Sequence, residues 1–583
     1  MTPTPTSNPS LAFRRADFQS LTEALDYAAQ GVTGLNFYSA RAELAATLTY
    51  AELRDRATTM ARGLIQAGIQ PGQRFVLLGD TDPDIITGFF ACQYASLVPV
   101  IVPIPASLGG RDAYVEQLKR LLTSSEAAVA MAPEAYLGFL EQAVAGLPVK
   151  PMIGSPADFA DLPGGAVDIR PFGPDDACYL QYSSGSTRWP HGVDVPQRCL
   201  MANGHAIAAH GLDVRPHDRG ISWLPLYHDM GLVGFLLTPL LCQLTCDYLA
   251  TRDFARRSLT WLKLIGDNGS SLSYSPTFGY DLCCRRAENT SQTFDLKSWR
   301  AAGIGGDMIQ PQVMERFADT FAPHGFDRKA FVASYGMAEA TLAVSFASLD
   351  RGLHVDQIDR TKLADAHVAL PVSSDDTGEG SRDFAFCGPA LPGHEIEVRD
   401  REGVALDDRL VGRIFVKGPS IAKGYFGEPE ASARVFKDGW LDTGDLGYLV
   451  NGEVVITGRS KDLMIINGRN IWPQDVEWAV EELEGLRRGD AAAFSIEEPA
   501  GEPEVIILVQ CRSRDSAYRE QLRKDVKAAA SRAVAIDGDV LLVPPHSLPM
   551  TSSGKLSRAR AKQNYVDGLY TDVDEPLAMA AGD

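Results

Sequence analysis

Cysteine is scarce in this sequence and forms no framework. The nine cysteines stand at positions 92, 178, 199, 242, 246, 283, 284, 387 and 511 of a 583-residue chain. Neither Cys242-x3-Cys246 nor the adjacent Cys283 and Cys284 is accompanied by a second ligand pair or a histidine at zinc spacing. These spacings argue against a disulfide scaffold or a zinc site and predict reduced, buried thiols in a cytoplasmic protein.

Positive charge is also in deficit. Lys and Arg total 55 against 75 Asp and Glu, which gives a formal net charge of −20. Such a chain is poorly suited to sequence-independent binding of nucleic acid or anionic lipid. If the protein binds a polyphosphate, it has to gather cationic side chains locally or recruit Mg²⁺.

A long, uninterrupted apolar run is missing as well. Residues 1–10 contain no basic residue and no apolar core, so they do not have the pattern of a secretory signal. The most apolar window, 231–250, is interrupted by Pro239, Gln243 and Asp247. We therefore expect no stable membrane insertion. We interpret this window as a buried helix, which could also line a pocket for an apolar substrate.

Helix and strand signals alternate regularly in the N-terminal part. Apolar spacing predicts helices at 18–29, 48–67 and 84–95, and short apolar runs predict buried parallel strands at 75–78 and 98–102. The alternation resumes after the loop at 182–193 and continues to about residue 345. This rhythm indicates doubly wound α/β structure.

Two later regions differ from this pattern. Short strands with frequent glycine predict a small β-rich subdomain at about 383–457. Beyond Gly-Arg-Ser-Lys-Asp at 458–462, helices near Val476 and at 518–534 and strands at 505–509 and 540–543 predict a compact α+β domain. We therefore expect an N-terminal domain at 1–457, a hinge at 458–462 and a C-terminal domain at 463–583.

The stretch 182–193 reads Tyr-Ser-Ser-Gly-Ser-Thr-Arg-Trp-Pro-His-Gly-Val. Its glycines let the backbone bend toward a ligand, and its amide and hydroxyl groups can form an anion-binding nest. No Gly-Lys-Ser/Thr follows at the spacing of a Walker loop. On these residues alone, a phosphate-binding loop and a Ser/Gly surface loop both remain open.

Six further blocks follow this loop in order. They are Ser-Trp-Leu-Pro-Leu-Tyr-His-Asp (222–229), Gly-Gly-Asp (305–307), Ser-Tyr-Gly-Met-Ala-Glu-Ala-Thr (334–341), Gly-Trp-Leu-Asp-Thr-Gly-Asp (439–445), Gly-Arg-Ser-Lys-Asp (458–462) and Thr-Ser-Ser-Gly-Lys (551–555). This ordered set resembles the adenylate-forming superfamily of acyl- and aryl-CoA synthetases, luciferases and peptide-synthetase adenylation domains. The resemblance implies an α/β fold with a large N-terminal domain of two doubly wound α/β subdomains plus a small β-barrel-like subdomain, and a small mobile α+β C-terminal domain.

Within the superfamily the chain is most similar to the fatty acyl-AMP ligases. Residues 458–463 lead into Asn-Gly-Arg-Asn-Ile-Trp-Pro-Gln-Asp-Val-Glu at 467–477, as in those ligases. The segment 342–387 is also longer than in typical acyl-CoA synthetases. The ligases carry an inserted motif there, thought to restrict the closing of the C-terminal domain that CoA requires. A floppy polar loop is the other interpretation that these residues allow.

The resemblance assigns ATP and Mg²⁺ to particular residues. The loop would hold the β- and γ-phosphates, and Glu339 would bind Mg²⁺ together with Thr187. Asp445 would bind the ribose, and Arg459 the ribose and phosphate, while Tyr335 would stack on adenine with Asp307 at its edge. The whole nucleotide set is Ser183, Ser184, Gly185, Ser186, Thr187, Arg188, Gly305, Gly306, Asp307, Ser334, Tyr335, Gly336, Met337, Ala338, Asp445, Arg459 and Lys555.

Four catalytic residues are implied: Lys555, His228, Glu339 and Thr187. Lys555 would bridge the incoming carboxylate and the α-phosphate, and His228 would lie beside both. Lys461 resembles the residue about which the C-terminal domain rotates. Taken singly, each has an ordinary alternative, such as a helix-terminal charge for Glu339, a turn-capping role for Asp445 or a solvated side chain for Lys461.

One residue departs from the superfamily pattern. A lysine or arginine usually stands where this chain has His191, and acyl-AMP ligases often lack it too. The departure removes one fixed charge from the phosphate loop, for which Arg188 could partly substitute.

The implied reaction converts a fatty acid and ATP to acyl-adenylate and pyrophosphate. The acyl group would then pass to the phosphopantetheine thiol of a separate acyl carrier protein, in fatty acid metabolism or lipid biosynthesis. The alternatives are an acyl-CoA synthetase and a non-catalytic binding protein. Acyl-pocket candidates are Trp223, Met230, Phe235, Ser275, Phe278, Tyr280 and the apolar stretch after Gly231. Acyl chain length, carrier identity and oligomeric state cannot be read from the sequence.

Overall fold

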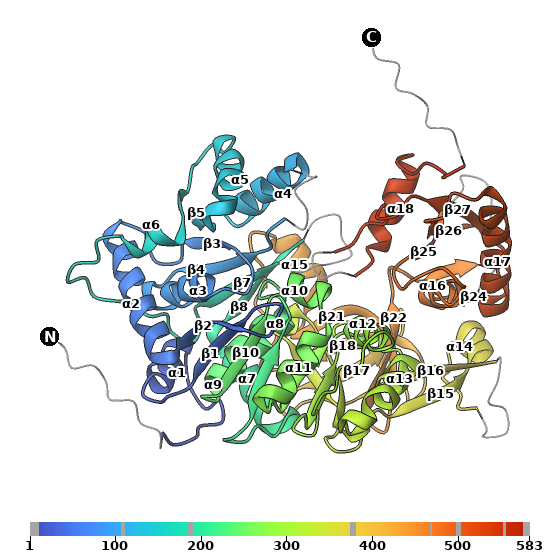
Figure 1. Ribbon diagram of the computed structural model, residues 1–583, viewed down its shortest axis with the longest axis horizontal. Coiled ribbons are helices and arrows are strands. Elements are labelled where there is room, and N and C mark those ends of the chain that lie inside the picture. The colour runs from blue at the N-terminus through green and yellow to red at the C-terminus, as the bar shows by residue number, and fades with distance from the viewer. Residues whose placement is uncertain are drawn as a thin grey trace, which may run out of the picture.

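The computed structural model describes residues 11–105, 111–182, 190–372, 380–466, 469–496, 503–551 and 555–574. Figure 1 shows the blue N-terminal elements at one end of the long axis and the red C-terminal elements at the other, with the green and yellow elements between them. The fold is mixed α/β, with a large N-terminal part and a smaller C-terminal domain, as the sequence predicts.

The first sheet is parallel and has the strand order β4 (Val98–Val102), β3 (Arg74–Leu78), β5 (Ala127–Met131) and β6 (Met152–Gly154). Its connecting helices include α2 (Tyr50–Gln66), α3 (Pro83–Ala95), α4 (Arg111–Ser124) and α5 (Glu134–Ala145). These elements, with α1 (Leu21–Ala28), confirm the predicted helices and strands of the N-terminal part to within three residues.

The large sheet has eight strands. Their order is β14 (Ala343–Phe346), β13 (Phe331–Gly336), β12 (Ala301–Ile304), β11 (Leu272–Ser275), β9 (Arg219–Ser222), β10 (Thr245–Leu249), β1 (Gly34–Tyr38) and β2 (Leu44–Thr49). All pairs are parallel except those made by the edge strands β14 and β2. The loops that follow the parallel strands therefore gather at one edge of the sheet. A separate three-stranded sheet pairs β7 (Ala177–Tyr182), β8 (Gly192–Pro196) and β19 (Gly424–Tyr425).

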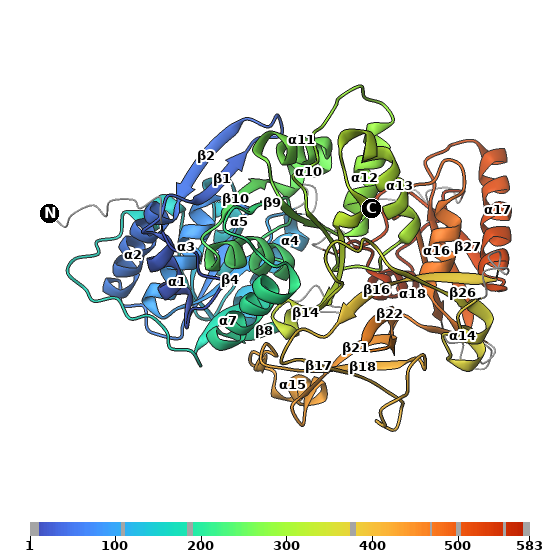
Figure 2. The same ribbon diagram turned by 90° about the horizontal axis from the view of Figure 1, so that it is seen from below.

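The helices α7 (Gln197–Ala206), α10 (Thr251–Arg256), α11 (Leu259–Asn268), α12 (Thr277–Ala287) and α13 (Pro311–Phe321) connect the strands of the large sheet. Figure 2 shows α11, α12 and α13 together on one side of the molecule.

The apolar window 231–250 is only partly helical, so its interpretation as one buried helix is wrong. It contains α8 (Asp229–Leu232), the π-helical turn η3 (Val233–Leu237) and α9 (Thr238–Leu241), and it then continues as strand β10. The chain turns at Gln243, whose φ is +50°. An evenly apolar run carries no period that separates a buried helix from a buried strand, which explains the error.

The β-rich subdomain is an antiparallel sheet. Its strands are β15 (Val355–Asp359), β16 (Ser381–Pro389), β22 (Glu453–Arg459), β21 (Trp440–Val450), β18 (Gly412–Lys417) and β17 (Glu395–Arg399), with β20 (Phe436–Lys437) paired to β21. The sheet begins upstream of residue 383, because β15 precedes α14 (Arg360–Ala366) and pairs with β16.

The C-terminal domain has its own apolar core. Strand β26 (Glu504–Gln510) lies between antiparallel β25 (Ala491–Ile496) and parallel β27 (Asp539–Val543), and a β-hairpin joins β23 (Met464–Ile466) to β24 (Arg469–Ile471). Its helices are α16 (Pro473–Glu481), α17 (Ser516–Val534) and α18 (Arg558–Val566). These elements confirm the predicted α+β composition.

Two expectations from composition can be compared with the structure. All nine cysteines are buried and free of disulfides, as predicted. Within the part of the chain that the structure describes, no helix is long and apolar enough to cross a membrane.

Asp247 joins three adjacent strands of the large sheet. It is fully buried on β10, and its carboxylate accepts hydrogen bonds from Arg219 Nε and Nη2 (2.8 Å each), Asn36 Nδ2 (2.8 Å) and Asn268 Nδ2 (2.9 Å). Since Arg219 lies on β9 and Asn36 on β1, a single carboxylate joins β9, β10 and β1 in the part of the sheet next to edge strand β2.

We expect Asp247→Ala to lower the free energy of unfolding by about 3–5 kcal/mol, because it removes one partner of a buried ion pair. Urea denaturation measures this loss. The matched control is Asp267→Ala, which removes a solvent-exposed partner of Lys263 and should change stability by less than about 1 kcal/mol. Equal, small effects of both substitutions would contradict this role for Asp247.

Candidate active site

One cavity of about 510 Å³ gathers most of the residues singled out from the sequence. Residues 305–307 follow β12 and residues 337–341 follow β13, so they meet at the same edge of the large sheet. The β-rich subdomain and the loop before α18 supply the remaining walls. The predicted residues that line this cavity are His228, Met230, Phe235, Gly306, Ser334, Tyr335, Gly336, Met337, Ala338, Glu339, Asp445, Arg459, Lys461 and Lys555.

Asp445 and Arg459 are direct cross-strand neighbours on β21 and β22. Arg459 Nε lies 3.3 Å from Asp445 Oδ1, and the Tyr335 hydroxyl donates a hydrogen bond to Asp445 Oδ2 (2.8 Å). Burial raises the pKa of the Asp445 carboxyl, while Arg459 and the Tyr335 hydroxyl act against the rise. The carboxylate is thus fixed by contacts to both oxygens and faces the cavity.

Glu339 lies in the short 3₁₀ turn Ala338–Ala340, and its Oε1 accepts a hydrogen bond from the Tyr425 hydroxyl (2.9 Å). Burial raises the pKa of the Glu339 carboxyl. The Tyr425 ring stacks on His191 (centroids 4.6 Å apart), and His191 Nδ1 lies 2.8 Å from Glu428 Oε2. His191 is therefore paired with an acidic residue, in the position where the superfamily usually has a cation.

The donor set around Glu339 is consistent with Mg²⁺ bound together with phosphate. Among the described residues, no cluster of three or more His, Cys, Asp or Glu side chains could hold a metal ion. Mg²⁺ commonly takes one or two protein carboxylates and completes its shell with phosphate oxygens and water. Thr187, the other expected ligand, lies outside the described residues, as do Ser183, Ser184, Gly185, Ser186 and Arg188.

His228 caps the start of α8. Its Nδ1 lies 2.6 Å from Asp229 Oδ1, and the Met230 N–H is closer to that carboxylate oxygen (2.7 Å) than to His228 Nδ1 (3.3 Å). We therefore place the Nδ1 proton toward Asp229, which leaves Nε2 available to the cavity. Although burial acts to raise it, the pKa of the Asp229 carboxyl is lowered by His228 and Lys555.

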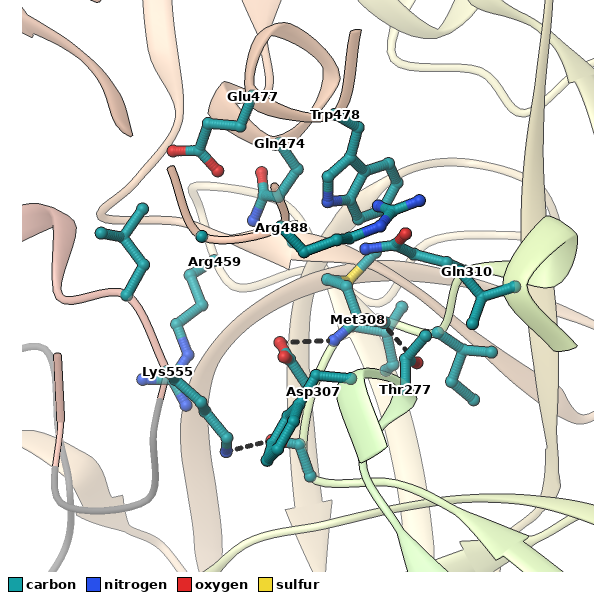
Figure 3. A pocket seen from close by; sticks show the side chains of 18 of the residues that line it. Thr277, Asp307, Met308, Gln310, Arg459, Gln474, Glu477, Trp478, Arg488 and Lys555 are labelled. Carbon is teal, nitrogen blue, oxygen red and sulfur yellow. Dashed lines mark hydrogen bonds between the residues drawn. The ribbon is translucent and has the colours of Figure 1, made fainter. Parts of the chain in front are cut away.

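Lys555 reaches the cavity from the C-terminal domain. Its ammonium group donates a hydrogen bond to the carbonyl oxygen of Gly306, and Figure 3 shows Lys555 close to Asp307. Burial lowers the pKa of Lys555, while Asp307 and Asp229 act to raise it. The structure thus brings a cation from one end of the chain to a site built by the other domain.

An apolar arm extends this cavity and is the candidate acyl pocket. Its lining includes Ile207, Leu212, Gly234, Phe235, Tyr274, Leu342 and Phe346. Of the sequence candidates, Met230 and Phe235 lie here. Gly234 falls within the predicted apolar stretch after Gly231, in η3. Ile207 of the π-helical turn η2 (Ile207–Gly211) was missed, because such a turn has no clear sequence signal, as were Leu212, Tyr274, Leu342 and Phe346.

The other acyl-pocket candidates lie elsewhere. Trp223 stacks on Phe254 with ring centroids 3.8 Å apart, and the Tyr280 hydroxyl donates to the Gly303 carbonyl (2.8 Å). Ser275 is fully buried and bonds to the adjacent backbone carbonyl of residue 276. None of these three lines a described cavity. Large size and apolarity indicated burial correctly but not which buried face borders a cavity.

A second cavity of about 410 Å³ separates α12 and α13 from the C-terminal domain. Figure 3 shows Thr277, Met308 and Gln310 on one side, and it shows Gln474, Glu477, Trp478 and Arg488 on the other. Lys555 and Asp445 border both cavities, whereas the sequence candidates Asp307 and Phe278 border only this one.

Comparison with known proteins agrees with this geometry. The sequence pattern of the family described as AMP-binding enzyme matches residues 34–426. A protein from Caulobacter vibrioides, provisionally named an acyl-CoA synthetase, is 51% identical over 98% of this chain and 99% of its own length. The long-chain-fatty-acid–AMP ligase FadD32 of Mycolicibacterium smegmatis is 31% identical over 92% of this chain and 91% of its own.

Solved structures agree as well. A chain from a study of fatty acyl-adenylate ligases of E. coli and L. pneumophila is 42% identical, with a TM-score of 0.91 over 96% of this chain and 100% of its own. A fatty acyl-adenylate ligase from L. pneumophila, solved with acyl adenylate and pyrophosphate, is 27% identical, with a TM-score of 0.72 over 95% of this chain and 98% of its own.

We expect Asp445→Ala to weaken ATP binding by about 1.5–3 kcal/mol, roughly 10- to 150-fold, because the charge-assisted hydrogen bonds expected between this carboxylate and the ribose would be lost. Isothermal titration calorimetry measures the dissociation constant. Glu402→Ala, an exposed turn position of the same subdomain, is the control and should bind ATP normally. Unchanged affinity in Asp445→Ala would contradict ribose binding at this carboxylate.

Proposed function

We propose that this chain, which belongs to the family of AMP-binding enzymes and is a fatty acyl-adenylate-forming ligase, passes its acyl group to the phosphopantetheine thiol of a separate acyl carrier protein. The observation that carries the first half-reaction is the convergence of Tyr335, Asp445, Arg459 and Lys555 on one cavity that continues into an apolar arm. Neither these four polar residues nor the apolar arm alone would distinguish fatty acid adenylation from other kinds of nucleotide binding.

In the first step a carboxylate oxygen of the fatty acid attacks the α-phosphorus of ATP and forms the acyl–phosphate bond. The bond between the α-phosphorus and the oxygen that bridges to the β-phosphate breaks, and pyrophosphate leaves with that electron pair. Both reactants are anions, so catalysis depends on in-line positioning and on positive charge at the phosphoryl oxygens. Lys555 supplies that charge between the carboxylate and the α-phosphate, and Arg459 adds a second cation. Mg²⁺ held by Glu339 would neutralise further phosphate charge.

The apolar arm favours a fatty acid as the substrate. Its side chains offer no ionic partner to a polar substrate, and each methylene that enters it gains about 0.8 kcal/mol. His228 and Lys555 line the same cavity as these apolar side chains. A fatty acid would therefore enter with its carboxylate toward these two residues.

The choice of acceptor rests on the inserted segment within 342–387, of which the structure describes residues 342–372 and 380–387. Within it, Arg382 is buried and lies 2.9 Å from Asp475 of the C-terminal domain. The guanidinium also stacks between Phe384 and Trp472, at 4.4 and 4.9 Å from their ring centroids. Any movement that left either charge buried without its partner would cost about 3–5 kcal/mol, so this contact opposes small displacements of the domain.

Three weaker contacts lie beside this pair. Arg360 donates to the backbone carbonyl of Ala533, Arg469 Nε lies 2.8 Å from Asp365 Oδ1, and Asn470 Nδ2 lies 2.8 Å from His367 Nδ1. Figure 1 shows α14 next to α17 and β24. Any rotation of the C-terminal domain about Lys461 would have to break these contacts.

These contacts support the carrier-protein acceptor. The resemblance to acyl-AMP ligases gives the inserted segment the role of restricting the domain closing that CoA requires. The name of FadD32 agrees with this proposal. The name of the Caulobacter relative instead favours CoA, which remains the second candidate acceptor.

The acceptor is identified by product analysis. Purified protein is supplied with ATP, Mg²⁺, fatty acids of several chain lengths, and either CoA or a holo acyl carrier protein. We expect pyrophosphate release in all cases and acyl transfer to the carrier only. Lys555→Ala should lower adenylate formation by orders of magnitude, because it removes the bridging cation. Rapid acyl-CoA formation would overturn the carrier proposal.

The inserted segment can be tested separately. We expect Arg382→Ala and Arg360→Ala each to raise acyl-CoA formation several-fold, with ATP–pyrophosphate exchange retained, because the contacts that oppose domain rotation are weakened. Thermal unfolding identifies variants that fail to fold, a risk greater for Arg382→Ala. Arg399→Ala is the matched control, since Arg399 also stacks on aromatic rings, those of Phe415 and Trp440, within its own subdomain. No gain in CoA use by folded variants would contradict the restraining role.

A further inference from the structure

Arg558 stands three residues after Lys555, at the start of α18, and its guanidinium holds two carboxylates. Nε and Nη2 lie 2.7 and 2.6 Å from the two oxygens of Glu477, and Nη1 lies 2.9 Å from Asp462 Oδ2. The side chains are 17% exposed for Arg558, 4% for Glu477 and 13% for Asp462. All three guanidinium nitrogens are therefore used in a mostly buried setting.

The two carboxylates belong to different parts of the molecule. Glu477 lies on α16 and accepts the Ala493 N–H of β25 (3.0 Å), so it belongs to the core of the C-terminal domain. Asp462 follows the hinge candidate Lys461, and its N–H donates to the carbonyl of Arg459 (3.1 Å). Arg558 therefore connects the Lys555 loop both to its own domain and to the turn that carries Arg459.

Three hydrogen bonds of backbone N–H groups stay within the Lys555 loop, while the Lys555 ammonium group donates to the Gly306 carbonyl of the other domain. The Lys555 N–H donates to Thr551 Oγ1 (3.1 Å), the Thr551 N–H to the Lys555 carbonyl (2.7 Å), and the Ser557 N–H to the Pro549 carbonyl (2.9 Å). These bonds shape the loop, but they do not place it relative to the Arg459 turn. Among the described contacts, Arg558 makes that connection through a side chain next to Lys555.

The local charges suit a guanidinium and not an ammonium. Although burial opposes it, the pKa of Arg558 is raised by Glu477 and Asp462. A third carboxyl, that of Glu481, lies on α16 together with Glu477. Burial and Glu477 raise the pKa of Glu481 to about 8. Lysine could neutralise part of this charge, but it cannot contact both Glu477 oxygens and Asp462 in one plane.

We propose that Arg558 is a positioning residue that sets Lys555 in register with Arg459, so that both cations reach the α-phosphate together. The Glu477 contact fixes Arg558 within the C-terminal domain. The Asp462 contact joins it to the hinge turn. This inference rests on the proposed adenylating function.

The test separates the two half-reactions. ATP–pyrophosphate exchange measures adenylate formation, and transfer from supplied acyl-adenylate to the holo acyl carrier protein measures the second step. We expect Arg558→Lys and Asp462→Asn to lower the kcat of exchange at least tenfold, with the KM for ATP changed less than threefold. Transfer from supplied acyl-adenylate should stay within about twofold of the unmodified protein. Lys555→Ala, which removes the cation itself, is the reference variant in the same assays.

Arg560→Ala, at an exposed position on the same helix, is the control and should leave both steps unchanged. Arg558→Ala is expected to lose more exchange activity than Arg558→Lys. Unchanged exchange in Arg558→Lys and Asp462→Asn would overturn the inference. If both half-reactions slowed equally and the thermal unfolding midpoint also fell, the inference would likewise be overturned. Such a result would indicate that Arg558 has a purely structural role. No exchange by the unmodified protein would overturn the adenylating function itself.

Discussion

Charge neutralisation is the constraint on which this structure depends. A chain with a net charge of −20 has to bring a carboxylate to a triphosphate, and five of its 55 Lys and Arg residues line the cavity. Arg459 arrives on a strand of the β-rich subdomain, and Lys555 arrives from the far end of the chain. Each is accompanied by acidic neighbours, Asp445 and Asp229, which fix the local geometry without filling the place of the substrate.

The same constraint explains why the C-terminal domain is attached at two places. The turn at 458–462 carries Arg459 and Asp462, and the inserted segment contacts α16 of the domain through Arg382 and Asp475. A cation on a separate domain is useful only if that domain is held in place during the reaction. The buried guanidinium of Arg382 and the two-carboxylate contact of Arg558 both provide such restraint, and both act on helix α16.

Much of this arrangement could be predicted from sequence, and the exceptions have physical reasons. The parallel strands and the blocks at 305–307 and 334–341 are local patterns, because apolar period and short motifs depend on neighbouring residues. Contacts between residues far apart in the chain could not be predicted from such local patterns. Arg382 and Asp475 are unremarkable singly, and nothing local pairs Asp462 with Arg558. The π-helical turn η3 and the strand within 231–250 were not distinguished from one buried helix, because an all-apolar stretch has no period that identifies its conformation.

The position of β1 in the large sheet has a consequence for synthesis of the chain. β1 pairs in parallel with β10, and the hydrogen-bonded side chains of Asn36 and Asp247 lie 211 residues apart in sequence. At a ribosomal rate of about 5–20 residues per second, β1 waits roughly 10–40 s for its partner strand. During that time its unpaired edge is open to association with other chains. The hairpin with β2 covers one edge of β1 early, and the other edge stays open until residues 245–249 have emerged.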